Sequence, residues 1–137
     1  MTNLSLAQSY LKKASDRLEI LDLLLRKGAY SDVVREAQKL VELALKGMLR
    51  AVGIEPPKFH DVGGLLLEHR DKFAADIVPA LERLAAVSKK LRKERELAFY
   101  GDIDFIPIEE YGPDDAKEAM EGAQFVLEIA RKVIASS

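Results

Sequence analysis

Residues 89–102 contain the side chains best suited to chemistry. Five of the seven residues in 89–95 are basic, and a tyrosine, Tyr100, follows close behind. A guanidinium such as that of Arg95 can stabilise charge on a phosphate, and a phenol can donate a hydrogen bond to a phosphate oxygen or stack on a base. On an ideal helix Arg95 and Tyr100 point about 140° apart, so they share a site only if the helix ends near Phe99. The alternative interpretation is a solvated basic face whose cations favour a helix C-terminus.

A second set of polar side chains lies upstream at helical spacing. Arg35, Lys39, Glu42 and Lys46 are separated by intervals of three and four residues, so on a helix they lie along one face. We expect this face to supply polar groups opposite the basic stretch. The alternative is ion pairing between residues four apart, which contributes about 0.2–0.5 kcal/mol per pair.

The two histidines form no metal-binding constellation. His60 precedes Asp61, a predicted helix cap, so it either acts as a ligand or base or packs against the start of that helix. His69 is expected to be exposed. The sequence has no HExxH motif, no phosphate-cradling glycine loop and no GxSxG motif, so we predict no metal and no cofactor.

Composition places the chain among ordinary globular proteins. Its 137 residues predict a single domain, 1–137, and the net charge of -2 argues against a sequence-wide electrostatic grip on nucleic acid. The absence of cysteine excludes disulfides, thiolate catalysis and cysteine-based metal sites. No long uncharged apolar stretch or signal peptide is present, so we expect a cytoplasmic protein that neither crosses nor anchors to a membrane.

Apolar positions recur at intervals of three and four residues through most of the chain, which predicts helices and no strands. The fold class is therefore all-α, an up-and-down bundle of about five helices, four long and one short. The long helices are expected at 4–27, 31–52, from near Asp76 to about 100, and from Pro113 onward. A short helix capped by Asp61 should end around Lys72. Residues 53–60 and 101–113 are predicted loops, the second one ordered.

Three stretches together resemble the HEPN domain family (higher eukaryotes and prokaryotes nucleotide-binding). They are REAQKLVELALK at 35–46, GIEPPKFHD at 53–61 and RELAFYGD at 95–102, and the resemblance covers nearly the whole chain. It implies an all-α bundle, usually dimeric, in which many members are metal-independent ribonucleases. Their motif is an arginine, a polar residue and a histidine four to six intervening residues after the arginine, and motifs from two subunits line one cleft. Some members are encoded beside a minimal nucleotidyltransferase as a toxin and antitoxin pair.

Carried over residue by residue, the motif arginine is Arg95 and its polar neighbour is Glu96. Tyr100 stands where the family has its histidine, and a phenol is a far poorer general base at neutral pH than an imidazole. In one subgroup the partner adenylylates a tyrosine two positions after the histidine, and that position here is Asp102. The resemblance therefore implies a binding site formed by Arg95, Glu96, Tyr100 and Asp102, with Arg35, Lys39 and Lys46 of the preceding face.

Three functions fit these residues. The first is a homodimer that binds nucleotide or RNA beside Arg95 and Tyr100 and works with a nucleotidyltransferase partner. The second is a weak ribonuclease in which two Arg95 side chains supply transition-state electrostatics and Tyr100 orients the substrate. The third is a non-catalytic helical interaction module in which Glu94 and Arg95 pair across a two-fold axis.

Charge is distributed unevenly along the chain. Residues 102–137 carry nine acidic and three basic side chains, and six of the acids lie between Asp102 and Asp115. If this acidic segment folds back over the basic run, it partly neutralises the site and favours a small ligand. If it points away, the site is open to RNA.

Overall fold

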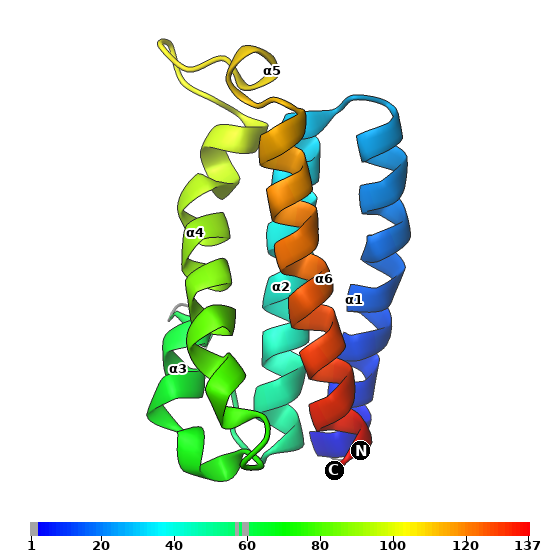
Figure 1. The fold of residues 1–137 in the computed structure, drawn as a ribbon, viewed down its shortest axis with the longest axis vertical. Helices are drawn as coiled ribbons and strands as arrows, with labels where there is room; N and C mark the ends of the chain where they lie inside the picture. The colour runs from blue at the N-terminus through cyan, green and yellow to red at the C-terminus, as the bar shows by residue number, and fades with distance from the viewer. Residues whose placement is uncertain (1–2, 57, 59–60) are drawn as a thin grey trace.

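The computed structural model describes residues 3–56, 58 and 61–137, and the regular elements within this part of the chain are all helices. The long helices run up and down in a bundle (Figure 1). Helix α1 (Asn3–Arg26) and helix α2 (Tyr30–Ala51) are antiparallel and joined by a turn in which Gly28 has a φ of +74°. The predicted bundle architecture and the predicted turn are confirmed.

Helix α2 is the centre of the molecule and packs against α1, α4 and α6. Apolar side chains on several of its faces are fully buried, which is expected of a helix surrounded by others. At about 1.5–3 kcal/mol for each large apolar side chain, this burial is the main source of cohesion in the bundle. The buried apolar residues of α2 are Val33, Val34, Ala37, Leu40, Val41, Ala44, Leu45, Met48 and Leu49.

Helix α3 (Val62–Glu68) is short and is capped by Asp61, as predicted. One carboxylate oxygen of Asp61 accepts a hydrogen bond from the Gly63 amide at 3.1 Å. The α-helical part ends earlier than expected, and a 3-10 turn, η1 (Arg70–Lys72), completes the segment. Gly63 allows α3 to approach α4 closely, because a methyl group there would lie 2.9 Å from the Cα of Ala85.

Helix α4 (Leu81–Phe99) begins later than predicted. A 3-10 turn that contains Pro79, η2 (Val78–Ala80), precedes it. The helix ends at Phe99, and Gly101 follows in the left-handed region with a φ of +71°. A Cβ atom at Gly101 would lie 2.4 Å from the Phe105 carbonyl oxygen, so this position needs glycine on two grounds.

Residues 101–112, which we call the tip, stand beyond the end of α4 (Figure 1). Asp102 and Phe105 exchange two backbone hydrogen bonds of 2.9 and 3.0 Å, and a short helix, α5 (Pro107–Glu110), follows. The Phe105 ring packs edge-on against Tyr111, which burial and the charges of Glu94 and Asp115 keep protonated by raising its pKa to about 12. The tip is therefore an ordered element, as the sequence predicted, although α5 within it was not foreseen.

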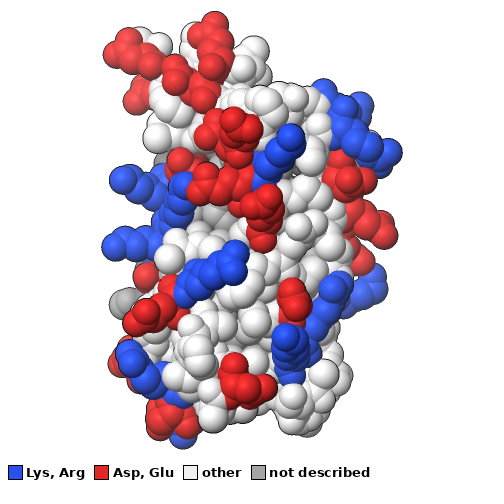
Figure 2. Space-filling model, in the orientation of Figure 1, with Lys and Arg blue, Asp and Glu red and all other residues white. Residues whose placement is uncertain are grey.

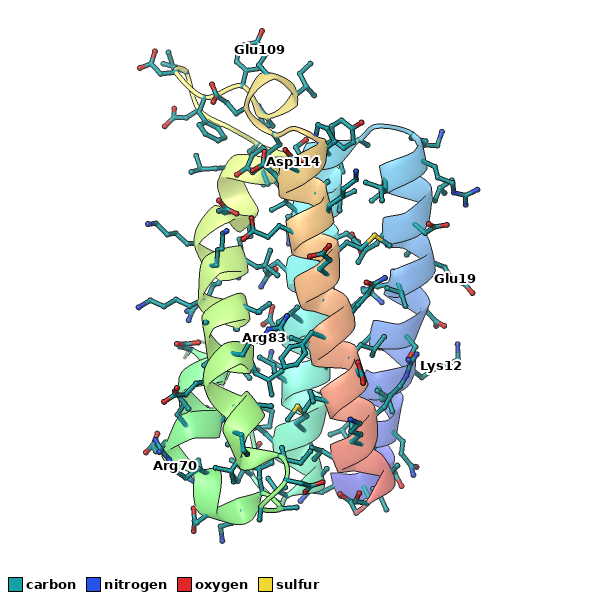
Figure 3. The ribbon with its side chains drawn as sticks, in the orientation of Figure 1. Lys12, Glu19, Arg70, Arg83, Glu109 and Asp114 are labelled. Carbon is teal, nitrogen blue, oxygen red and sulfur yellow. The ribbon has the colours of Figure 1, made fainter. Side chains whose placement is uncertain are left out.

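The last helix, α6 (Pro113–Ala135), begins where predicted. Its first turn carries Asp114 and Asp115, whose charges favour a helix N-terminus, and Figure 3 shows Asp114 there below Glu109 of the tip. Arg83 of α4 reaches toward α6, with its guanidinium carbon 3.9 Å from the centre of the Phe125 ring. The helix has a buried stripe of small and aliphatic side chains: Ala116, Ala119, Ala123, Leu127, Ala130 and Ile134.

Among the described residues, no helix is both long enough and apolar enough to cross a bilayer.

The two adjacent glycines of α3 provide a test of how closely α3 must pack on α4. We expect Gly63→Ala to lower the free energy of unfolding by about 1–3 kcal/mol, because its methyl group meets backbone atoms of α4. Gly64→Ala is the matched control, because a methyl group there has ordinary contacts and improves helix propensity by up to about 1 kcal/mol. Urea denaturation followed by circular dichroism measures both. Equal stabilities for the two variants would contradict the close packing.

Candidate anion-binding site

Arg95 lies in the last turns of α4 and lines a small pocket between α2 and α4. This pocket, which we call the central pocket, has a volume of about 110 Å³. The loop before α3 and the start of α3 close its third side. The lining residues are Gln38, Glu42, Lys58, Val62, Ser88, Arg92 and Arg95.

A larger and more open depression adjoins the central pocket at the end of α4. This terminal hollow has a volume of about 410 Å³ and is lined by Arg92, Lys93, Arg95, Leu97, Tyr100, Gly101 and Asp102. Because α4 ends at Phe99, the chain turns and brings Tyr100 to the same hollow as Arg95. The Tyr100 ring contacts Phe99 edge-on at 4.8 Å and remains 77% exposed. Its phenol is thus available to a ligand.

The wall of the central pocket on α2 is a chain of polar contacts. Arg35 Nη1 donates to Gln38 Oε1 at 3.3 Å, and Gln38 Nε2 donates to Glu42 Oε2 at 3.2 Å. Lys46 Nζ lies 3.2 Å from the other carboxylate oxygen of Glu42. Ion pairing between residues four apart, the alternative weighed from the sequence, is therefore present for Glu42 and Lys46. Gln38 is only 5% exposed, and its amide orients the carboxylate.

Glu42 is the acidic member of the central pocket, and its environment keeps it ionised. Burial alone would raise its pKa. Hydrogen bonding and charge from Lys46, a hydrogen bond from Gln38 and the charge of Arg95 outweigh burial and hold the Glu42 pKa below its ordinary value of 4.5. Glu42 is thus already occupied by partners on its own helix.

Cations dominate the central pocket. Lys58, Arg92 and Arg95 enter it from the loop and from α4. In the described part of the chain, none of the three has a carboxylate within 4.0 Å. A half-buried guanidinium such as that of Arg95, without an ion-pair partner, favours an anion, and a phosphate can accept two parallel hydrogen bonds from it. The arrangement is suited to holding a phosphate group.

The other residues proposed from the sequence occupy different places. The Arg35 guanidinium carbon lies 5.9 Å from the centre of the Phe99 ring, at the edge of the site. Lys39 is exposed and lines neither the central pocket nor the terminal hollow. Lys46 does not line the central pocket, but it forms an ion pair with Glu42, which does. Lys46 lines a third hollow, which Lys58 also lines.

For His60 and Glu96 the structure cannot be compared with the prediction, and for His69 the prediction was wrong. His60 is not described, and Glu96 is placed only through the backbone of α4, so its side chain is not described. His69 was expected to be exposed but is half-buried, because it lies at the C-terminus of α3 between that helix and η1.

Glu94 and Arg95 line different depressions, although they are neighbours in sequence. Glu94 lies in a groove between α4 and α6 together with Lys90, Asp115 and Glu118. Lys90 forms an ion pair with Glu118 there, and the hydrogen bond that Lys90 donates to Glu118 raises the Lys90 pKa. Lys90 therefore points toward α6. Of the basic residues in 89–95, those that line the central pocket or the terminal hollow are Arg92, Lys93 and Arg95.

Sequence reasoning missed Gln38, Lys58 and Arg92 as members of the site. Gln38 had a detectable signal, because it lies three residues after Arg35 and four before Glu42. Arg92 lay within the basic run but had no feature that set it apart. Lys58 follows two prolines in a loop, and no helical spacing could relate it to Arg95. Among the described residues, no three histidine or acidic side chains converge as metal ligands would.

Comparison with known proteins relates this geometry to a family. The model of the HEPN domain matches residues 7–133. The chain is 26% identical over 136 residues to a Methanocaldococcus jannaschii protein named "Putative toxin MJ1304", covering 94% of this chain and 88% of that protein. Two crystal structures resemble the fold. ST0689, described as an archaeal HEPN homologue, has a TM-score of 0.70 at 26% identity, and TT1696 from Thermus thermophilus has 0.69 at 24%. Each comparison covers 93% of this chain and 97% of the other.

The lowered pKa of Glu42 predicts how stability depends on pH. A carboxyl group whose pKa is lower in the folded state stabilises the fold above its unfolded pKa, and this contribution is lost as the pH falls through the folded pKa. At pH 7 we expect Glu42→Gln to unfold about 1 kcal/mol more easily than the wild type, because charged hydrogen bonds to Lys46 and Gln38 are weakened. The difference should shrink toward pH 3.

Urea denaturation at pH 7, 5 and 3 measures this effect. Glu128→Gln is the control, because Glu128 forms an exposed pair with Lys132 four residues away on α6. A constant difference between the wild type and Glu42→Gln across the pH range would contradict the assignment.

Proposed function

Because the chain belongs to the HEPN domain family, we propose that it binds a nucleotide or RNA through a phosphate group held beside Arg95 in the central pocket. The observation that carries this proposal is the convergence of Lys58, Arg92 and Arg95 on one small pocket whose acidic residue, Glu42, is already paired with Lys46. A phosphate supplies the missing negative charge and the hydrogen-bond acceptors.

The sizes of the two depressions assign them different parts of the ligand. Pockets that enclose whole small molecules measure about 300–1,000 Å³. The central pocket, at about 110 Å³, is too small for a nucleoside and suits a phosphate group. The terminal hollow, at about 410 Å³, can receive a nucleoside, and the exposed Tyr100 ring offers a surface for base stacking.

Binding is favoured over cleavage by the residue that stands in place of the family's histidine. Tyr100 can donate a hydrogen bond or stack on a base, but a phenol is a weak general base at neutral pH. Arg95 retains its role in either case, because charge on a phosphate is present both in a bound ligand and in a transition state.

We extend the proposal to the biological setting: a homodimer that acts as the toxin-like member of a pair with a minimal nucleotidyltransferase. The name of the M. jannaschii relative supports the toxin-like role. The very exposed Ile103 and Ile108 of the tip, at 93% and 85%, are consistent with a protein that docks against another chain.

Binding to uridine monophosphate and short single-stranded RNA tests the site. We expect Arg95→Ala to weaken affinity about 10- to 100-fold, because a charged hydrogen-bond donor to the phosphate contributes about 1.5–3 kcal/mol. Arg131→Ala is the matched control, because Arg131 is exposed on α6 and contacts Ser15 of α1. Calorimetry at two salt concentrations gives the affinities, and circular dichroism verifies the fold. Undetectable binding by the wild type, or equal binding by Arg95→Ala, would overturn the proposal.

Expression in a bacterial host tests the paired arrangement. We expect the wild-type chain alone to slow growth, Arg95→Ala to restore it, and co-expression of a small nucleotidyltransferase encoded beside this gene to restore it as well. Growth curves and co-purification of the two proteins are the measurements. Undisturbed growth with the wild-type chain, or the lack of any such neighbouring reading frame, would argue against the toxin-like role and leave the binding site to be judged on its own data.

A further inference from the structure

The structure assigns a second phosphate subsite at the junction of α1, α2 and the loop that follows α2, and we propose that a single-stranded oligonucleotide spans it and the central pocket. The inference rests on the proposed function for the central pocket. The subsite is an open hollow of about 550 Å³ lined by Tyr10, Lys46, Arg50, Glu55, Pro56 and Lys58. We call it the distal hollow.

Arg50 is the main cation of the distal hollow, and its hydrogen-bonding capacity is incompletely used. Its Nε is buried without a partner in the described part of the chain. One terminal nitrogen donates to the side-chain oxygen of Asn3 at 3.3 Å, and the other lies 4.0 Å from Glu55, whose side chain is 84% exposed. A guanidinium held at its base and weakly paired at its end is suited to an incoming anion.

The distal hollow adjoins the central pocket, and the central pocket adjoins the terminal hollow, because each neighbouring pair shares lining cations. Lys58 lines both the distal hollow and the central pocket. Arg92 and Arg95 line both the central pocket and the terminal hollow. The three depressions therefore form one track along α2 and α4, with six cations and three carboxylates. The cations are Lys46, Arg50, Lys58, Arg92, Lys93 and Arg95, and the carboxylates are Glu42, Glu55 and Asp102.

The volumes of the three depressions, in their order along the track, fit the alternation of nucleosides and phosphates in a nucleic-acid strand. A constricted pocket for phosphate lies between two open hollows, each large enough for a nucleoside. Each open hollow contains one tyrosine, Tyr10 at one end and Tyr100 at the other, on which a base can stack. An inorganic polyphosphate would use the cations but neither ring.

The span of the track along α2 favours an oligonucleotide over a mononucleotide as the ligand that fills it. Gln38 of the central pocket and Arg50 of the distal hollow both lie on α2, twelve residues apart. At 1.5 Å per residue they are separated by about 18 Å along the helix. A stacked strand advances about 3.4 Å per nucleotide, so about five nucleotides cover this distance. A ligand that extends from Gln38 to Arg50 is therefore expected to be an oligonucleotide.

The dependence of affinity on strand length tests the inference. The probes are uridine monophosphate and oligouridylates of two, four, six and ten nucleotides, measured by calorimetry or fluorescence anisotropy. We expect affinity to rise at least tenfold from one to six nucleotides and then to level off. Arg50→Ala should weaken binding of the six-nucleotide strand about tenfold and leave uridine monophosphate unchanged. It should also reduce the salt dependence by about 0.7 in log K per log salt.

A second variant tests the subsite while removing only a weak, exposed ion pair. Glu55→Gln takes one exposed carboxylate out of the distal hollow, so it should strengthen binding of the six-nucleotide strand severalfold and leave uridine monophosphate unaffected. Lys132→Ala, on the exposed face of α6, is the control and should change neither affinity. The unfolding midpoint of each variant accompanies the measurement.

The outcomes separate this inference from the proposed function. Binding of uridine monophosphate that depends on Arg95, combined with no gain on lengthening the strand, would overturn the distal subsite and retain the central pocket. Loss of all binding in the wild type would overturn both. Polyphosphate that binds as tightly as an oligouridylate with the same number of phosphates, unaffected by Tyr10→Leu, would show anion binding without base contacts and contradict the oligonucleotide.

Discussion

The burial of α2 is the constraint on which the rest of the structure depends. With α1, α4 and α6 packed around it, α2 has little surface left for water, so a polar side chain on its inner faces must find its partners inside the protein. Gln38 and Glu42 meet this requirement through their contacts with each other, with Arg35 and with Lys46. The polar wall that α2 presents to the central pocket therefore has its partners on α2 itself, whereas the cations facing it from α4 do not.

The end of α4 is the second determinant of the site. A continued helix would direct Tyr100 away from Arg95, and termination at Phe99 turns the chain so that both residues line the terminal hollow. Gly101 makes this turn possible, because it combines a positive φ with a close approach of the Phe105 carbonyl. The turn at Gly101 thus both ends α4 and places Tyr100 beside Arg95.

Much of the fold could be predicted from sequence because helical periodicity reports which residues are buried. The stripes of α1 and α6, the cap at Asp61 and the end of α4 all follow from local rules. The exceptions are places where tertiary packing decides. Helix α4 begins only after a 3-10 turn rather than near Asp76, and His69 is half-buried between short elements. The residues of the candidate site could be predicted only in part, since Lys58 and Arg50 line the same hollow but are related by no helical spacing in the chain.

The proposed anion-binding track is compatible with the net charge of -2, because the charges are unevenly distributed. Acidic side chains gather on the tip, which extends past the end of α4, while basic side chains project from the side of α4 below it (Figure 2). Glu118 pairs with Lys90 on the side of α6, where the groove between α4 and α6 contains more carboxylates than cations. The positive field is left on the side of α4 that faces α2. At physiological ionic strength charges are screened over about 8 Å, so this field acts on groups inside the track and little beyond it. The ligand that we propose would therefore be held by contact with Arg95 and its neighbours rather than attracted over a long distance, which suits a short single strand better than a long duplex.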